Sequence, residues 1–159
     1  MLLHILAVGD VVSERGLDCL HHHLRALKKE HDIHFTVVNG ENAAGLGLLP
    51  RHADEIFDAG ADVITLGNHT WSRLQIADHL DQSPYILRPA NFAPNLPGRG
   101  FGVFEGPQGL RIGVLNLMGR FELDSNLSSP FEKADRILAG EGKYADVMLV
   151  DFHVEATSE

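Results

Sequence analysis

Short apolar runs alternate along this chain with segments in which apolar residues recur every three or four positions. Runs of the first kind predict buried β-strands, and segments of the second kind predict amphipathic helices. The clearest helix face is a series of leucines with spacings of three, four and three: Leu17, Leu20, Leu24 and Leu27. This alternation of strands and helices is typical of an α/β fold with a largely parallel sheet.

The boundaries of these elements follow from the apolar runs and from residues that start or stop helices. The predicted strands occupy residues 3–8, 33–38, 62–66 and 146–150. Further helices are predicted to begin at Pro50, at the capping-box pattern of residues 72–75, and at Ser129-Pro130. Of this last helix, Phe131, Ala134, Ile137 and Leu138 share one face. The proline-rich stretch between residues 83 and 109 predicts turns, and residues 101–105 and 110–116 predict a hairpin.

The composition fits a single soluble domain. The chain has 159 residues, of which 44% are apolar, enough to bury a core. With 22 acidic and 13 basic residues its net charge is −9, which disfavours an extended nucleic-acid-binding surface because such surfaces are normally basic. The single cysteine, Cys19, excludes an internal disulfide. No apolar run approaches the roughly 18 residues of a membrane span and no signal peptide is evident, so we expect a cytoplasmic protein without membrane contact.

Polar clusters follow four of the predicted strands: Gly9-Asp10, residues 39–42, residues 67–69 and residues 151–153. Because the carboxyl ends of parallel strands share one edge of a sheet, we expect these clusters to meet there. Their carboxylate, amide and imidazole groups suit Mn, Fe, Zn or Mg, and two such metals can activate a water for phosphoryl displacement. The simpler interpretation is that Asp and Asn after strands form turns or cap helices.

The sequence motifs around these clusters identify a protein family more specifically than the position of the clusters does. Four segments read VNGENAAG (38–45), GADVITLGNHTW (60–71), LRPANF (87–92) and DFHVEATSE (151–159). They resemble the calcineurin-like metallophosphoesterases, and most closely the YmdB-like family. The resemblance extends from Ile5 to Glu159.

The resemblance implies a fold and a reaction. The fold would be an α/β/β/α layered sandwich with a mostly parallel first sheet. The reaction would be hydrolysis of phosphodiesters, with 2′,3′-cyclic nucleotides as the expected substrates, by a metal-activated hydroxide at a two-metal site. The cofactors would be two divalent metal ions, and Fe, Mn and Zn all accept such ligands. His69 would stabilise or protonate the leaving oxygen.

The resemblance also implies a set of metal ligands. Asp10 would bind the first metal, and Asn42 would lie beside it. Glu41 would occupy the bridging position, which most metallophosphoesterases give to an aspartate. Asn68 and His153 would bind the second metal.

Two departures from the family pattern stand out. The family usually has glycine where this chain has Ser13, and arginine where it has Leu17, so the first loop lacks two of the family's usual residues. The family also carries a Gly-x-His-x-His segment further downstream, which supplies one histidine to each metal. The chain ends at Glu159 without that segment, and the only comparable sequence, His21-His22-His23, is expected to be a solvated stretch of helix.

These departures leave alternatives open. Residues 1–159 are expected to form one metallophosphoesterase domain that is incomplete at its C-terminus, so the strand near Val150 should leave a sheet edge or apolar face unpaired unless another chain covers it. A homo-oligomer is one way to cover it. The competing interpretation is a non-catalytic remnant or a regulatory binding protein that retains the fold, and a monophosphatase or nuclease of the same superfamily is a third.

Several conspicuous side chains receive no site role from the sequence. Five histidines are expected to be surface or strand residues without an identifiable partner: His4, His31, His34, His52 and His79. Trp71 suits either the mouth of the site or packing at a helix start. Cys19 is expected to be structural rather than nucleophilic.

Overall fold

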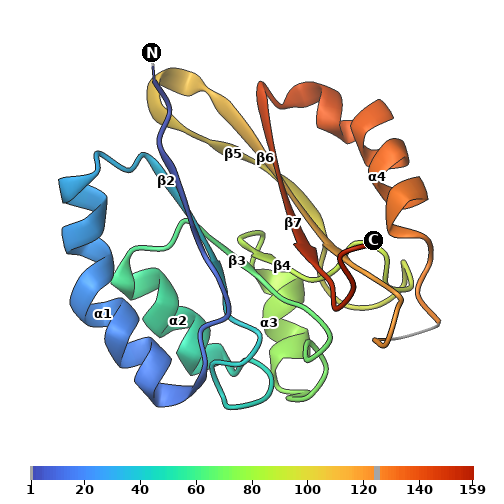
Figure 1. Ribbon diagram of the computed structural model, residues 1–159, viewed down its shortest axis with the longest axis horizontal. Coiled ribbons are helices and arrows are strands. Elements are labelled where there is room, and N and C mark those ends of the chain that lie inside the picture. The colour runs from blue at the N-terminus through green and yellow to red at the C-terminus, as the bar shows by residue number, and fades with distance from the viewer. Residues whose placement is uncertain (1, 124–125) are drawn as a thin grey trace.

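The computed structural model describes residues 2–123 and 126–159, and its first sheet consists of four parallel strands (Figure 1). In sheet order these strands are β1 (Ile5–Val8), β2 (Phe35–Asn39), β3 (Val63–Thr65) and β4 (Ile86–Leu87). The connecting helices are α1 (Ser13–Glu30), α2 (Pro50–Ala59) and α3 (Ile76–Gln82). Each crossover returns the chain through a helix, which is the connection that neighbouring parallel strands require.

The second sheet has three strands in the order β5-β6-β7. These are β5 (Phe101–Glu105), β6 (Arg111–Met118) and β7 (Val147–His153). The first two form the predicted antiparallel hairpin, which is closed by the 3-10 turn η1 (Pro107–Gly109). The chain then passes through α4 (Pro130–Ala139) and the 3-10 helix η2 (Glu141–Tyr144) before β7 pairs parallel to β6.

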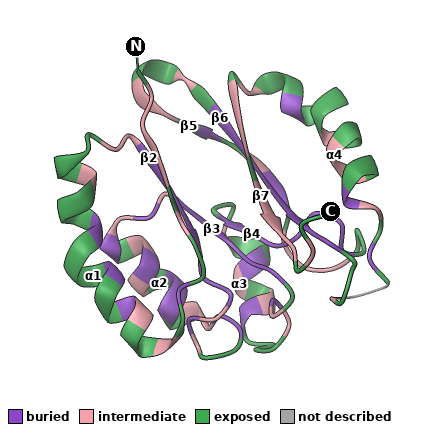
Figure 2. Cartoon of the chain, in the orientation of Figure 1, coloured by how far each residue is buried: buried purple, intermediate pink, exposed green. Residues whose placement is uncertain are grey.

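Three apolar layers hold these elements together. Between the helices α1 to α3 and the first sheet, the buried side chains include Leu17, Leu24, Ile56, Ile64 and Leu80. Between the two sheets they include Phe35, Val37, Val63, Ile112 and Val114. On the outer face of the second sheet, Leu115 and Leu117 meet Ala134 and Ile137 of α4. Strands β2, β3, β4 and β6 are largely buried and the outer faces of the helices are exposed, which confirms the predicted α/β/β/α sandwich (Figure 2).

The third helix does not begin at the predicted capping box. Residues 72–75 form turns, and α3 begins at Ile76 without a side-chain cap. The hydroxyl that should cap the helix faces another partner, because Ser72 Oγ lies 3.4 Å from Nδ1 of His69. The Ser72 hydroxyl therefore lies next to the His69 ring and does not cap α3.

In two helices, fewer apolar residues are buried than the apolar spacing of the sequence predicts. Leu27, the last leucine of the α1 series, is 39% exposed, whereas Leu17, Leu20 and Leu24 are buried. In α4, Ala134 and Ile137 pack inward, but Phe131 and Leu138 are exposed. The predicted cap of α4 is confirmed, since Ser129 Oγ accepts a hydrogen bond from the Glu132 N–H at 3.3 Å.

The last strand is longer than predicted and lies at a sheet edge. It runs through Asp151 to His153 because its register with β6 continues to the pair Met118–His153. The residues expected to follow this strand are therefore part of it. As predicted, β7 pairs on one side only among the described residues, and Val150 is 45% exposed. No helix in the described part of the chain is both long enough and apolar enough to cross a bilayer.

Candidate functional site

The carboxyl ends of β1, β2 and β3 bring three of the predicted clusters to one edge of the first sheet. The turn after β2 is held against its neighbours by backbone bonds: the N–H of Val11 donates to the carbonyl of Asn39 at 2.9 Å, and that of Gly40 donates to the carbonyl of Thr65 at 3.0 Å. The end of β7 joins them from the second sheet, since the Asp151 carboxylate is hydrogen-bonded to the Thr65 hydroxyl. Side chains from four strand ends thus meet at the junction of the two sheets.

Asp10 and Asn42 form the outer pair of this site. Asn42 Nδ2 donates to both carboxylate oxygens of Asp10, at 2.9 and 3.1 Å. The loop carrying Asn42 is fixed to the start of α1, because the Ser13 N–H donates to the Asn42 carbonyl at 2.9 Å. Asp10 itself is exposed, so its carboxylate remains accessible from solvent.

Glu41 lies at the centre of the site and is fully buried. Its Oε1 is 2.9 Å from Nδ1 of His153, and its Oε2 accepts the backbone N–H of His69 at 3.0 Å. Gly67 makes this position possible, because a Cβ there would lie 2.5 Å from both carboxylate oxygens. One carboxylate thus joins the loop after β3 to the end of β7.

The two ionisable groups at the centre shift each other's pKa. Burial by itself raises the pKa of Glu41, but the His153 ring and the His69 N–H outweigh it, so the carboxyl pKa lies below its ordinary 4.5. The contact with Glu41 raises the pKa of His153 above its ordinary 6.5, although burial opposes this. Both shifts favour the ionised forms of the pair.

Two oxygens at the site still lack a hydrogen-bond partner among the described residues. Glu41 Oε1 approaches His153 without hydrogen-bond alignment, and Asn42 Oδ1 is buried with no donor. Buried acceptors without partners are rare and destabilising. Carboxylate and amide oxygens of this kind can bind cations, and carboxylate, amide and imidazole form a donor set suited to a divalent first-row metal. The residues therefore fit a metal.

Asn68 and His69 lie on the solvent side of Glu41. Asn68 is exposed, and its Nδ2 lies 3.5 Å from Nε2 of His69. The His69 ring is placed between this amide and the Ser72 hydroxyl. Trp71 does not start a helix but packs edge-on against Phe92, with ring centroids 5.9 Å apart, and so supports this loop from behind.

Sequence reasoning missed Asn116, which connects the two sheets directly behind the site. Its Nδ2 donates to the carbonyl of Leu66 at 2.7 Å and to that of Leu87 at 2.8 Å. The residue is fully buried in the middle of β6. One asparagine inside an apolar run was the available signal, because a buried amide has to find partners outside its own strand.

The structure also explains the two departures near the first loop. Ser13 has φ +59°, a left-handed conformation that glycine adopts without strain. Leu17 is 2% exposed and packs in the core beneath α1, so position 17 contributes to the core rather than to the surface of the site. Asp10, by contrast, lies after β1 and is hydrogen-bonded to Asn42.

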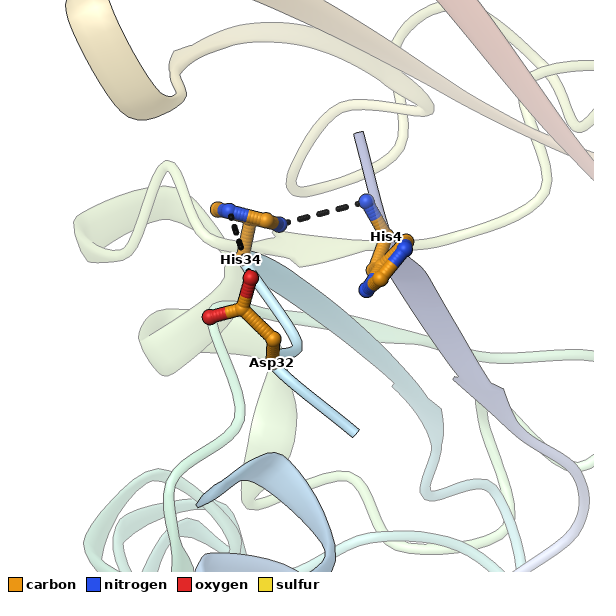
Figure 3. Close-up of side chains that lie close together, drawn as sticks. All are labelled: His4, Asp32 and His34. Carbon is orange, nitrogen blue, oxygen red and sulfur yellow. Dashed lines mark hydrogen bonds and ion pairs between the residues drawn. The ribbon is translucent and has the colours of Figure 1, made fainter. Parts of the chain in front are cut away.

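The expectations for three of the remaining histidines are wrong. His52 is 1% exposed within α2, and its Nε2 lies 3.3 Å from Glu14. His4 and His34 are not isolated, because they form a group with Asp32 just before β1 and β2 (Figure 3). The run His21-His22-His23 is exposed, as predicted.

The group formed by His4, Asp32 and His34 has ligand atoms within 4.8 Å of one another, a spacing that a metal could bridge. His34 Nδ1, however, accepts the backbone N–H of His4 at 3.2 Å. A neutral ring then carries its proton on Nε2, which faces Asp32 at 3.7 Å. A metal would have to displace one of these contacts, so we assign none here.

Comparison with known proteins places the chain in a family. Residues 6–159 match the family described as YmdB-like protein. The chain is 42% identical, over 99% of its length, to the 2′,3′-cyclic-nucleotide 2′-phosphodiesterase of Bacillus subtilis (strain 168), of which it covers 59%.

Two solved structures have the same fold. A hypothetical protein from Thermus thermophilus has a TM-score of 0.88 at 38% identity, over 98% of this chain and 59% of that one. A structure described as a novel phosphatase from Mycoplasma pneumoniae has a TM-score of 0.87 at 31% identity, over 98% and 57%. The chain thus spans somewhat more than half the length of these relatives. The match over residues 6–159, together with the motifs around Glu41 and Asn68, shows that the chain belongs to the YmdB-like protein family.

Proposed function

We propose that residues 1–159 form a metallophosphoesterase domain that takes part in metal-dependent hydrolysis of phosphodiesters, with 2′,3′-cyclic nucleotides as substrates. The observation that supports this most directly is the buried Glu41 carboxylate, which lies between His153 and the His69 loop with one oxygen lacking a hydrogen-bond partner among the described residues. The name of the Bacillus subtilis relative supports the substrate class.

The proposed site holds two divalent ions, with Fe, Mn and Zn as the candidates. Asp10 would hold the first ion with Asn42 beside it, Asn68 and His153 would hold the second, and Glu41 would lie between them. Asp10 and Asn42 already face each other, and Glu41 already contacts His153. Such ions supply, when bound, activation of a water and neutralisation of charge on the phosphoryl oxygens.

His69 is the proposed proton donor. Its backbone is anchored to Glu41, and its ring lies between Asn68 and Ser72 at the exposed side of the site. Opening the 2′ P–O bond of a cyclic phosphate adds hydroxide to phosphorus and requires a proton on the departing 2′-oxygen. An imidazole beside the substrate can deliver that proton. The products would be a nucleoside 3′-phosphate with a free 2′-hydroxyl.

The test combines metal analysis with turnover. We expect the purified chain to bind Mn or Zn, and to hydrolyse 2′,3′-cyclic AMP in a reaction that chelator stops and Asn68→Ala reduces at least tenfold. His69→Ala should lower kcat while leaving metal content unchanged. The exposed variant His22→Ala is the matched control and should behave like wild type.

A second candidate function is a regulatory binding protein that retains the fold. The edge of β7, which pairs on one side only among the described residues, favours it. Metal-free, inert protein would support this second function and contradict the first. A homo-oligomer that covers β7 would be detected as a larger mass in solution by light scattering.

A further inference from the structure

A basic cavity of about 440 Å³ opens between α4 and the segment around β4 and β5. Four of the 13 lysine and arginine residues of the chain line it: Arg88, Arg99, Lys133 and Arg136. Among the described residues, Glu141 is the one carboxylate in its lining. The chain as a whole carries a net charge of −9, so this cavity has the opposite sign to the molecule around it. Its volume is within the range of small-molecule sites, roughly 300–1,000 Å³.

The surface cations of this cavity have no side-chain partners within residues 2–123 and 126–159. In this described part of the chain, Arg99, Lys133 and Arg136 take part in no side-chain hydrogen bond and no ion pair. By contrast, Arg111 forms a two-point pair with Asp146. Like charges gathered around one cavity repel one another, and an anion among them removes that repulsion.

Arg88 adds a buried positive charge to the same lining. It is 4% exposed, and its guanidinium donates only to backbone carbonyls: those of Pro89, Ala93, Leu96 and Pro97. No carboxylate of the described residues lies within ion-pair distance of it. Burial lowers the pKa of Arg88, and the more distant charge of Asp81 opposes this only in part. A buried charge without a counter-ion is unfavourable, and an anion in the cavity would compensate it.

A second cavity of about 260 Å³ continues from the first and approaches the candidate site. The two share Pro94, Lys133 and Arg136, and the second is also lined by Asn91, Phe92, Ser128 and Glu132. In this second cavity, Nδ2 of the lining residue Asn91 donates to the carbonyl of Met118, and Met118 is paired with His153 between β6 and β7. The lining residue Phe92 packs on Trp71, close in sequence to His69. Amide, hydroxyl and aromatic groups next to a cationic cavity suit a nucleoside joined to a phosphate.

We propose that the basic cavity binds a phosphate group of a nucleotide ligand, at a position separate from the phosphodiester that is hydrolysed. Arginine is well suited to this role, because its guanidinium offers two parallel N–H donors to phosphate oxygens. The phosphate belongs either to a free nucleotide or to the backbone of an RNA strand. The assignment rests on the proposed function only for the nucleotide character of the ligand.

The test is binding under chelator, so that no hydrolysis can occur. Fluorescence anisotropy is measured with a fluorescein-labelled single-stranded oligoribonucleotide, with AMP and inorganic phosphate as competitors. We expect Arg136→Glu to raise Kd at least tenfold, and Lys133→Gln to raise it severalfold. Lys143→Glu is the matched control, because this exposed lysine of η2 carries the same charge change but does not line the cavity, and its Kd should stay within twofold of wild type.

The outcomes separate this proposal from the proposed function. Competition by AMP identifies a free nucleotide as the ligand, and binding of the oligonucleotide without such competition identifies the strand backbone. Equal Kd values for Arg136→Glu and Lys143→Glu, or no binding by wild type, would overturn the proposal even if the chain hydrolyses cyclic nucleotides. Cavity-dependent binding by a chain without hydrolytic activity would uphold it while the proposed function fails. Thermal melts of the variants verify that they fold.

Discussion

Among individual residues, the central interaction is the ion pair of Glu41 and His153, because each group shifts the pKa of the other toward its ionised form. In metal-free protein we expect His153 to titrate above pH 6.5, and Glu41→Gln to lower its pKa, since the contact with Glu41 is the largest cause of the rise and the charges of Asp151 and Glu155 are smaller ones. Histidine Cε1 resonances followed by NMR against pH measure this directly. An unchanged His153 titration in Glu41→Gln would show that the pair does not form.

Gly67 permits this pair to form, and replacing it tests how closely the site is packed. Gly67→Ala places a Cβ 2.5 Å from both Glu41 oxygens, so the carboxylate has to move. We expect at least a tenfold loss of metal affinity in a calorimetric titration. Gly9→Ala is the matched control at the same site, because nothing lies within 4 Å of its added Cβ. Equal affinities of the two variants would contradict the prediction.

Ser13 has a strained backbone conformation, and the family pattern has glycine at this position, which adopts the conformation without strain. Because its φ of +59° favours glycine, Ser13→Gly should raise the free energy of unfolding by on the order of 0.5 kcal/mol, after allowing for the greater flexibility of glycine in the unfolded chain. Urea denaturation measures this. Ala26→Gly, on the exposed face of α1, should instead lower stability by about 0.5–1 kcal/mol. A loss of stability in Ser13→Gly would show that the serine side chain has a stabilising contact.

At the scale of elements, Asn116 adds hydrogen bonds to the apolar packing that holds β6 against the first sheet. Asn116 donates from β6 to the carbonyls of Leu66 and Leu87, and Asn116→Ala removes both hydrogen bonds, although the Leu87 carbonyl keeps the Leu66 N–H as a donor. We expect stability to fall by about 2–3 kcal/mol. Asn95→Ala, in an exposed loop, should change it by less than about 0.5 kcal/mol. Chemical denaturation compares the two, and similar values would mean that the sheets are held together by apolar packing alone.

At the scale of the whole molecule, the same ion pair makes stability depend on pH. Glu41 has a lowered pKa in the folded state, so its contribution is complete above pH 4.5 and is lost as pH falls through the folded value. His153 has a raised pKa, so its contribution is complete below pH 6.5 and is lost as pH rises through the folded value. The difference in Tm between metal-free wild type and Glu41→Gln should therefore be largest between pH 4.5 and 6.5. A difference that grows steadily toward pH 9 would contradict this.

Metal binding should change how stability depends on pH above 6.5, where the contribution of the ion pair alone falls. A histidine has to be neutral to coordinate a metal, so binding near pH 6.5 releases the proton of His153. The two sheets contribute different parts of the site, since Glu41 follows β2 in the first and His153 ends β7 in the second. Occupation of the site would consequently stabilise the junction of the sheets as well as the local loops.

The sequence by itself determined most of the strands and helices, and the polar residues that follow the first three predicted strands, because apolar periodicity and turn chemistry are local properties. It also identified the family through the motifs around Glu41, Asn68 and His153. Only the tertiary structure decided which distant groups meet. The capping of α3, the extent of β7, the role of Asn116 and the cations gathered beside α4 all depend on packing between elements. Such long-range contacts leave no periodic pattern along the chain, so they cannot be predicted from local sequence patterns.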